Sequence, residues 1–144
     1  MAKDALALLL IGGVGARYGT TPPKQFQVFE GKPLFLHAAA IISKQVERIV
    51  YVCNPDYLDL AKKQLEEASL LKAKDVIIPG GDNRQHSVLN GLLFLEKDGL
   101  DESSVVVIND GNRPHISEEI VSECIREAKT HLASVTAYPS TDSI

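Results

Sequence analysis

The amino-acid sequence predicts an α/β protein in which a mostly parallel sheet is covered by helices on both faces. Short apolar runs alternate with amphipathic stretches along the 144 residues, as in chains built from repeated strand–helix units. The runs are continuously apolar, which is typical of strands buried on both faces. The composition, with 44% hydrophobic and 24% charged residues, is that of ordinary globular proteins and suits a packed core. We therefore expect a single domain over residues 1–144.

Each expected element has its own local signal. Pro33 suits the first position of a helix, Asn54 and Pro55 end the second apolar run, and Ser117 with its following glutamates suits a helix start. The expected strands cover Ala5–Ile11, Val46–Cys53, Val76–Ile78, Ser104–Ile108 and Ala133–Tyr138. The expected helices cover residues 33–43, 55–68, 87–95 and 117–131. In parallel sheets ligands bind outside the carboxyl ends of the strands, so the segments that follow the strands are the candidate site.

Charge and cysteine content exclude several functions. A net charge of -4 and a pI near 5.5 argue against a general nucleic-acid binder, which usually has a basic stripe. The apolar run Ala5–Ile11 is too short to span a membrane. Cys53 and Cys124 have neither disulfide nor zinc-ligand spacing, which predicts a reduced, cytoplasmic compartment.

The first candidate segment follows the first strand and contains Gly12, Gly13 and Gly15. Glycines after a strand let backbone N–H groups approach phosphate oxygens closely. Arg17 can bind a phosphate with its guanidinium fork, and Lys24 adds a compact positive charge. These residues predict a loop that binds the phosphates of a nucleotide.

Three other interpretations of this segment were weighed. A P-loop is excluded because no Gly-Lys-Ser/Thr occurs. A dinucleotide fingerprint, as in an NAD(P)-dependent oxidoreductase, has Tyr18 where its third glycine belongs, and Asn54 follows the next strand instead of an acid. The third interpretation is a turn that only links two elements. It is the minority interpretation, because several glycines occur together with Arg17 and Lys24 in one short stretch.

The second segment, Pro79–Val88, again places glycines at the end of a strand. Asp82 suits either the cap of the next helix or a ligand contact. Arg84 and Ser87 are expected one turn apart on the exposed start of that helix, where an anion or a base edge can bind. His86 is expected to be a surface histidine.

The third segment, Val107–Pro114, places Asp110 directly after a buried strand. An acid there is a common metal or hydroxyl partner, although an Asx turn also explains it. Arg113 precedes Pro114 in a tight loop, which restricts the direction of its side chain.

Together these segments resemble the 2-C-methyl-D-erythritol 4-phosphate cytidylyltransferase family and the related ribitol-5-phosphate cytidylyltransferases. The family pattern A-[AG]-G-x-G-x-R-[MF]-G…P-K-Q-[FY] is matched by Gly12–Gly19 and Pro23–Phe26. G-G-x-x-R-x-x-S-V-x-x-G-L is matched by Gly80–Leu92, and H-D-[AG]-x-R-P by Asn109–Pro114. The resemblance implies a three-layer α/β/α Rossmann-like nucleotidyltransferase fold that transfers CMP from CTP to a sugar or polyol phosphate with Mg²⁺.

The resemblance also implies a role for each matching position. Arg17 and Lys24 would be catalytic, and Arg113 and Ser143 would contact the substrate. Asp110 would also be a metal ligand. The implied nucleotide-binding residues are Ile11, Gly12, Gly13, Gly15, Gly81, Asp82, Ser87, Asp110 and Gly111.

This sequence also departs from the family pattern. Ile11 replaces a small residue, Tyr18 replaces Met, Asn109 replaces His, and His115 stands where an apolar residue is usual. Family members continue past position 144 through an arm that pairs two subunits and a later phosphate-binding lysine. The resemblance therefore implies a family homodimer whose pairing arm is missing here, and a truncated, non-catalytic nucleotide-binding module is an alternative to the enzyme.

Overall fold

The computed structural model describes residues 5–11, 23–113, 115–135 and 137. Its centre is a four-stranded sheet in the order β5-β4-β1-β6. The strands are β1 (Ala5–Ile11), β4 (Arg48–Cys53), β5 (Val76–Pro79) and β6 (Val105–Asp110). All neighbouring strands pair in parallel, with Leu8 of β1 opposite both Val50 and Ile108. The predicted parallel sheet is confirmed.

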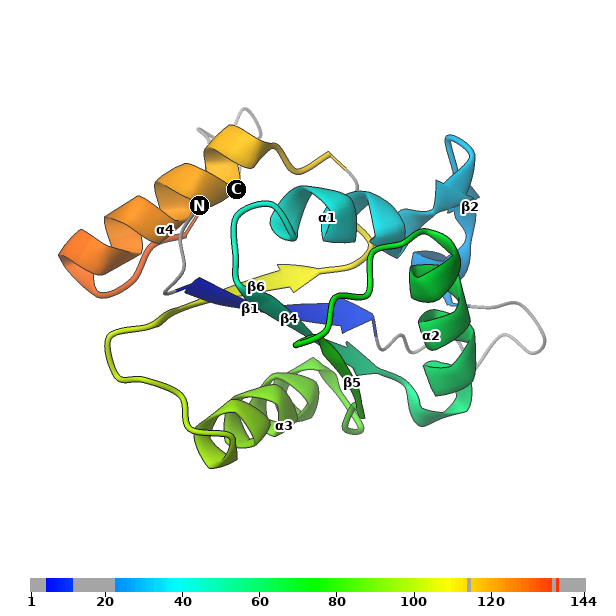
Figure 1. Cartoon of the computed structure of the whole chain (residues 1–144), viewed down its shortest axis with the longest axis horizontal. Coiled ribbons are helices and arrows are strands. Elements are labelled where there is room, and N and C mark those ends of the chain that lie inside the picture. The colour runs from blue at the N-terminus through cyan, green and yellow to red at the C-terminus, as the bar shows by residue number, and fades with distance from the viewer. Residues whose placement is uncertain (1–4, 12–22, 114, 136, 138–144) are drawn as a thin grey trace, which may run out of the picture.

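Helices cover both faces of this sheet (Figure 1). The helices are α1 (Leu34–Ile42), α2 (Leu58–Glu67), α3 (Arg84–Lys97) and α4 (Glu118–His131). Odd-numbered residues of β1 pack with α1, α2 and α4, whereas Leu6, Leu8 and Leu10 pack towards α3. Every residue of β1 is buried, because both of its faces are covered; this is why its sequence is apolar without alternation.

A 3₁₀ turn and a hairpin lie in the described part of the chain between β1 and α1. The 3₁₀ turn η2 (Lys24–Phe26) is followed by an antiparallel hairpin of β2 (Val28–Phe29) and β3 (Lys32–Pro33). Its turn has positive φ at Glu30 and at Gly31. This hairpin is not predictable from the sequence, because strands of two residues leave no periodic signal.

Several helices and strands begin or end at residues other than those predicted. The helix expected over 87–95 begins at Arg84, and the strand expected to end at Ile108 continues to Asp110. A separate 3₁₀ turn, η3 (Pro55–Tyr57), precedes α2. The Ser117 cap is confirmed, because its Oγ accepts a hydrogen bond of 3.1 Å from the N–H of Ile120.

The strand expected over Ala133–Tyr138 is wrong at residues 133–135 and 137, which form no strand. Leu132 ends α4 in the left-handed conformation, and Ser134 Oγ then donates 2.7 Å to the carbonyl of Cys124. The chain is thereby held against α4, and the side chain of Val135 is 88% exposed. A β-branched sequence forms a strand only where another strand offers its backbone groups, and no described strand does so here.

Candidate active site

The three candidate segments follow strands whose carboxyl ends share one edge of the sheet. β1 ends at Ile11, β5 at Pro79 and β6 at Asp110, and the strands are parallel. Gly12, Gly13, Gly15, Arg17 and Ser143 lie outside the described residues, so their roles stay predictions. The remaining candidate residues can be placed at or near this edge.

The end of β6 lies directly against the end of β1. The N–H of Gly111 donates a hydrogen bond of 2.7 Å to the carbonyl of Leu10. A Cβ at Gly111 would lie 2.6 Å from Ile11 Cγ2, closer than atoms can pack, and 3.1 Å from Phe35 Cβ, which is a tight contact. Gly111 is therefore required by the close approach of two strand ends, and the approach brings the third segment to the start of the first.

The turn between β5 and α3 is organised by two side chains. Asn83, and not Asp82, caps α3: Asn83 Oδ1 accepts a hydrogen bond of 2.9 Å from the N–H of His86. Ser87 is only 7% exposed, and its Oγ accepts a hydrogen bond of 3.1 Å from the N–H of Gly81. Of the two alternatives for Asp82, the cap is thus excluded, and the expected exposure of Ser87 is wrong, because the helix begins earlier and turns Ser87 inward.

Two consequences follow for the second segment. Asp82 and His86 are exposed, so the predicted surface position of His86 is confirmed and the Asp82 side chain is available to a ligand. A Cβ at Gly81 would lie 2.3 Å from His86 Cβ. The turn is compact enough to require glycine at this position.

Asp110 is the point where the second and third segments meet. Its Oδ1 accepts a hydrogen bond of 3.0 Å from Arg84 Nε, and its Oδ2 lies 3.4 Å from Arg113 Nε. The Asp110 side chain is 24% exposed, whereas the two arginines are 60% and 74% exposed. The carboxylate is therefore largely enclosed between two cations whose outer surfaces remain open to solvent.

Lys24 lies on the short turn after the glycine segment. Phe26 is buried there and contacts the rings of Phe35 and Tyr57, each with centroids 5.3 Å apart. Lys24 is an exposed residue of this anchored turn. The local fold thus presents a lysine at the surface directly after the glycine segment in the sequence.

An aromatic contact connects the β2–β3 hairpin to the residue that follows the third segment. The ring of Phe29, in β2, lies edge-on to the ring of His115 at 5.6 Å. Phe29 also contacts His37, whose Nε2 lies 2.6 Å from the Phe29 carbonyl oxygen. In the sequence, His115 is only a departure from the family pattern, and no signal there predicts its contact with the hairpin.

The residues present fit Mg²⁺ only as an ion that arrives with a ligand. No cluster of three or more His, Cys, Asp or Glu is found among the residues that the structure describes. Mg²⁺ is commonly held by one or two carboxylates together with substrate phosphates. Asp110 can supply such a carboxylate, so the donor set suits a metal–nucleotide complex better than a free metal ion.

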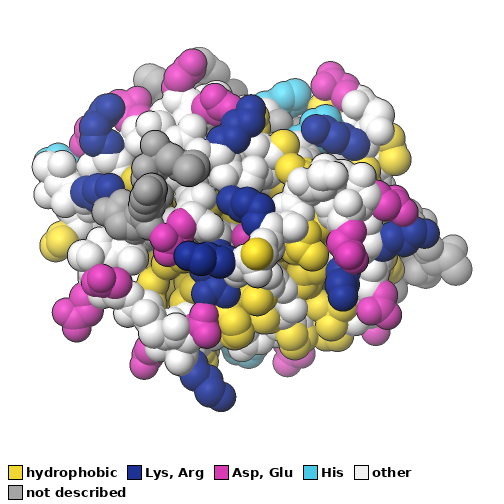
Figure 2. All heavy atoms as spheres, viewed as in Figure 1, with side chains coloured by type: hydrophobic (Ala, Val, Ile, Leu, Met, Phe, Trp, Pro, Cys, Tyr) yellow, Lys and Arg dark blue, Asp and Glu magenta, His cyan; other side chains and the backbone are white. Residues whose placement is uncertain are grey.

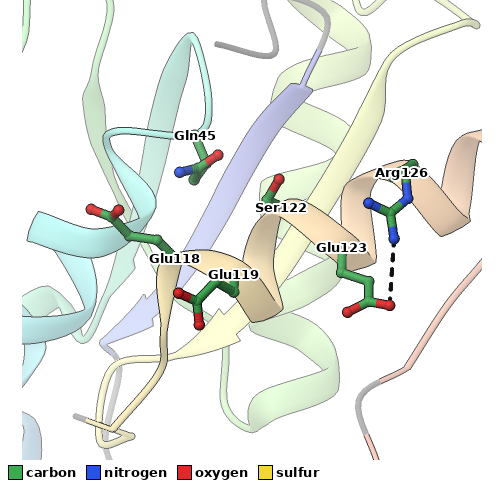
Figure 3. Close-up of a pocket in the computed structure, with 6 residues that line it drawn as sticks. All are labelled: Gln45, Glu118, Glu119, Ser122, Glu123 and Arg126. Carbon is green, nitrogen blue, oxygen red and sulfur yellow. Dashed lines mark ion pairs between the residues drawn. The ribbon is translucent and has the colours of Figure 1, made fainter.

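A cavity of about 400 Å³ lies elsewhere, between α4 and the segment that joins α1 to β4 (Figure 3). It is lined by Gln45, Glu118, Glu119, Ser122, Glu123 and Arg126. Three carboxylates with one guanidinium repel an anionic phosphate. We therefore do not assign this cavity to the nucleotide.

On the face shown in Figure 2, basic and acidic side chains are intermixed and form no continuous basic stripe. Burial raises the pKa of the Cys53 thiol to about 12, which keeps the weakly nucleophilic protonated form at neutral pH. No helix in the described part of the chain has the length and hydrophobicity to cross a bilayer.

The structure is that of an α/β protein with a parallel sheet, whose carboxyl edge carries close-packed glycines, an enclosed aspartate and exposed cations, where ligands bind in such sheets. Comparison with known families agrees. The chain belongs to the 2-C-methyl-D-erythritol 4-phosphate cytidylyltransferase (IspD) family, whose sequence profile matches residues 5–144.

Individual relatives carry two different names. A ribitol-5-phosphate cytidylyltransferase of Vibrio parahaemolyticus is 36% identical over 141 residues, covering 96% of this chain and 58% of that protein. A 2-C-methyl-D-erythritol 4-phosphate cytidylyltransferase of Thermosipho africanus is 36% identical over 140 residues, covering 96% of this chain and 60% of that protein. This chain therefore spans less than two thirds of the length of these relatives.

Solved structures show the same fold. A 4-diphosphocytidyl-2C-methyl-D-erythritol synthase superposes with a TM-score of 0.69 at 23% identity, covering 89% of this chain and 55% of the other. The corresponding synthase of Anaerococcus prevotii gives 0.67 at 24% identity, covering 88% and 52%. The predicted nucleotidyltransferase fold is thus confirmed.

Proposed function

We propose that this chain binds CTP at the carboxyl edge of the sheet and transfers CMP to the phosphate of a polyol phosphate. The observation that carries the proposal is the meeting of two motif segments at Asp110, where Arg84 from the start of α3 contacts the last residue of β6. Membership of the cytidylyltransferase family supports CTP as the nucleotide.

The proposed reaction is an in-line displacement. A phosphate oxygen of the acceptor attacks the α-phosphorus of CTP, the bond from that phosphorus to the bridging oxygen breaks, and pyrophosphate leaves with the electron pair. Mg²⁺ bound with CTP would neutralise part of the phosphate charge. Little covalent chemistry is asked of the protein, so positioning and electrostatic stabilisation supply the rate.

Each described site residue is proposed to have its own role in binding or transfer. Lys24, which is exposed on the turn anchored by Phe26, is proposed to stabilise the negative charge that develops on the leaving group. The Gly81 turn and exposed Asp82 are proposed to border the cytosine and ribose. Asp110 and Arg113 are proposed to lie between the nucleotide and the acceptor phosphate, and Arg113 keeps an exposed guanidinium for that phosphate.

We place 2-C-methyl-D-erythritol 4-phosphate first as the acceptor and ribitol 5-phosphate second. The family profile supports the first acceptor, whereas the Vibrio relative supports the second at the same identity as the Thermosipho relative. The first would give the chain a role in isoprenoid precursor synthesis, and the second a role in CDP-ribitol synthesis. A homodimer and a cytoplasmic location stay predictions from the sequence.

Calorimetry on the 144-residue chain with CTP and Mg²⁺ tests the binding part. We expect CTP to bind, and UTP and NAD(P) to bind at least tenfold more weakly or not at all. Preferred binding of NAD(P) would favour a dinucleotide-dependent oxidoreductase instead.

A pyrophosphate-release assay tests the transfer part. CTP and Mg²⁺ are supplied with each acceptor in turn, to the 144-residue chain and to a fusion that adds the remaining C-terminal part of one of the relatives. Release with one acceptor identifies the substrate. CTP binding without release in either form would favour a non-catalytic nucleotide-binding module, and absence of both would contradict the proposed function.

A further inference from the structure

The start of α3 carries an arginine where a helix usually avoids one. Arg84 is the first residue of α3, and no acidic residue lies in that first turn. The N-terminal end of a helix has a partial positive charge, so a cation there is unfavourable for the helix itself. Helix stability therefore does not explain the guanidinium at this position.

The partner of Arg84 does explain it. Arg84 Nε donates 3.0 Å to Oδ1 of Asp110, which lies 26 residues later at the end of β6. Arg113 lies 3.4 Å from the other carboxylate oxygen. With one cation on each oxygen, the plane of the Asp110 carboxylate is fixed, and removing Arg84 would leave it free to turn towards Arg113.

We propose that Arg84 is a positioning residue, which holds the Asp110 carboxylate in the orientation that receives CTP and joins the β5–α3 turn to the end of β6. A largely exposed ion pair contributes little to stability, and Arg84 is 60% exposed. Its effect is therefore expected on nucleotide affinity and not on folding. The inference rests on the proposed binding of CTP at this edge.

A double-mutant cycle tests whether Arg84 acts through Asp110. CTP affinity in the presence of Mg²⁺ is measured by calorimetry for the wild-type chain, Arg84→Gln, Asp110→Asn and the double variant. We expect Arg84→Gln to weaken binding by about 5- to 20-fold, within the coupling usual for contacting charged residues. The double variant should bind no more weakly than Asp110→Asn alone, and Arg84→Lys should lie between wild type and Arg84→Gln.

Two controls separate positioning from a general structural role. Arg126→Gln removes another exposed arginine, which pairs with Glu123 in α4 at 3.4 Å; its CTP affinity should equal that of wild type. The melting temperature of Arg84→Gln should stay within about 2 °C of wild type, as expected for a surface substitution.

The outcomes distinguish this inference from the proposed function. If wild type binds CTP and Arg84→Gln binds equally well, the positioning role is wrong. If the two single losses multiply in the double variant, Arg84 acts independently of Asp110, which also overturns the inference. If wild type does not bind CTP, the proposed function fails, and the positioning role fails with it.

Discussion

The N–H of Gly111 and the carbonyl of Leu10 are joined by a hydrogen bond of 2.7 Å, which fixes the turn after β6 against the last residues of β1. This contact decides how closely the third candidate segment approaches the end of β1 at Ile11. A side chain at Gly111 cannot be accommodated without moving one of the two strand ends, because its Cβ would lie 2.6 Å from Ile11 Cγ2.

We expect Gly111→Ala to lower both stability and CTP affinity. Overpacking of this kind typically costs about 1–3 kcal/mol of unfolding free energy, which urea titration measures. Displacement of the strand end should also weaken CTP binding, which calorimetry measures. A substitution that leaves both quantities unchanged would contradict the close packing of these two segments.

Gly31→Ala is the matched comparison. Nothing lies within 4 Å of a Cβ at Gly31, but its φ is +87°, so only backbone strain of about 1 kcal/mol is expected. CTP affinity should be that of wild type, because the β2–β3 turn is not one of the proposed nucleotide contacts.

Lys24→Ala tests the proposed role of the Lys24 positive charge. Because Lys24 is exposed, unfolding free energy should change by less than about 0.5 kcal/mol. Pyrophosphate release should fall by about 10²–10³-fold in a form that turns over, as for the loss of one transition-state donor. Lys32→Ala removes another lysine from the neighbouring hairpin and should leave turnover nearly unchanged.

Lys24→Ala also distinguishes nucleotidyl transfer from an NAD(P)-dependent oxidoreductase. A dinucleotide-dependent oxidoreductase has no need of Lys24 for hydride transfer, so NAD(P) binding that is unchanged in Lys24→Ala, without pyrophosphate release by wild type, would favour that alternative over nucleotidyl transfer.

Asn83→Ala and Asp82→Ala separate capping from ligand binding at adjacent positions. Loss of the Asn83 cap should cost about 1 kcal/mol of unfolding free energy, because the N–H of His86 loses its acceptor. Asp82→Ala should leave stability within about 0.5 kcal/mol of wild type but weaken CTP binding. A larger stability loss from Asp82→Ala than from Asn83→Ala would contradict the assignment of the cap.

Alkaline pH should destabilise the fold through two buried groups. Burial raises the pKa of Cys53 from 9.0 to about 12, and burial together with the charge of Asp75 raises the pKa of Tyr51. The folded chain therefore keeps the Cys53 proton at a pH where the unfolded chain releases it. The stability linked to this proton is complete below pH 9 and is lost as the pH rises towards about 12.

Urea titrations between pH 8 and pH 11 measure this loss. We expect Cys53→Ala to reduce the slope of unfolding free energy above pH 9 by up to about 1.4 kcal/mol per pH unit. Cys124→Ala removes the cysteine that is only partly buried and serves as the control. Equal slopes for wild type and Cys53→Ala would contradict the proposed linkage.

The sequence alone determined the sheet, most of its helices and the edge that carries the candidate site. Continuous apolar runs predicted parallel strands, because strands buried on both faces need apolar residues at every position. The Ser117 cap was also predictable, since its hydrogen bond is made within one turn of chain. Such signals are local or follow directly from burial, so they can be read from neighbouring residues.

Only the tertiary structure decided which residues meet. Arg84 and Asp110 were each singled out in the sequence, but their contact depends on how α3 lies relative to β6, and no local pattern encodes that. Asn83, and not Asp82, caps α3, and Ser87 faces the interior. Both follow from the position at which α3 begins, which its packing against the sheet determines. The strand expected after residue 132 failed for the same reason: strand formation depends on a partner supplied from elsewhere in the chain, and the residues by themselves do not supply it.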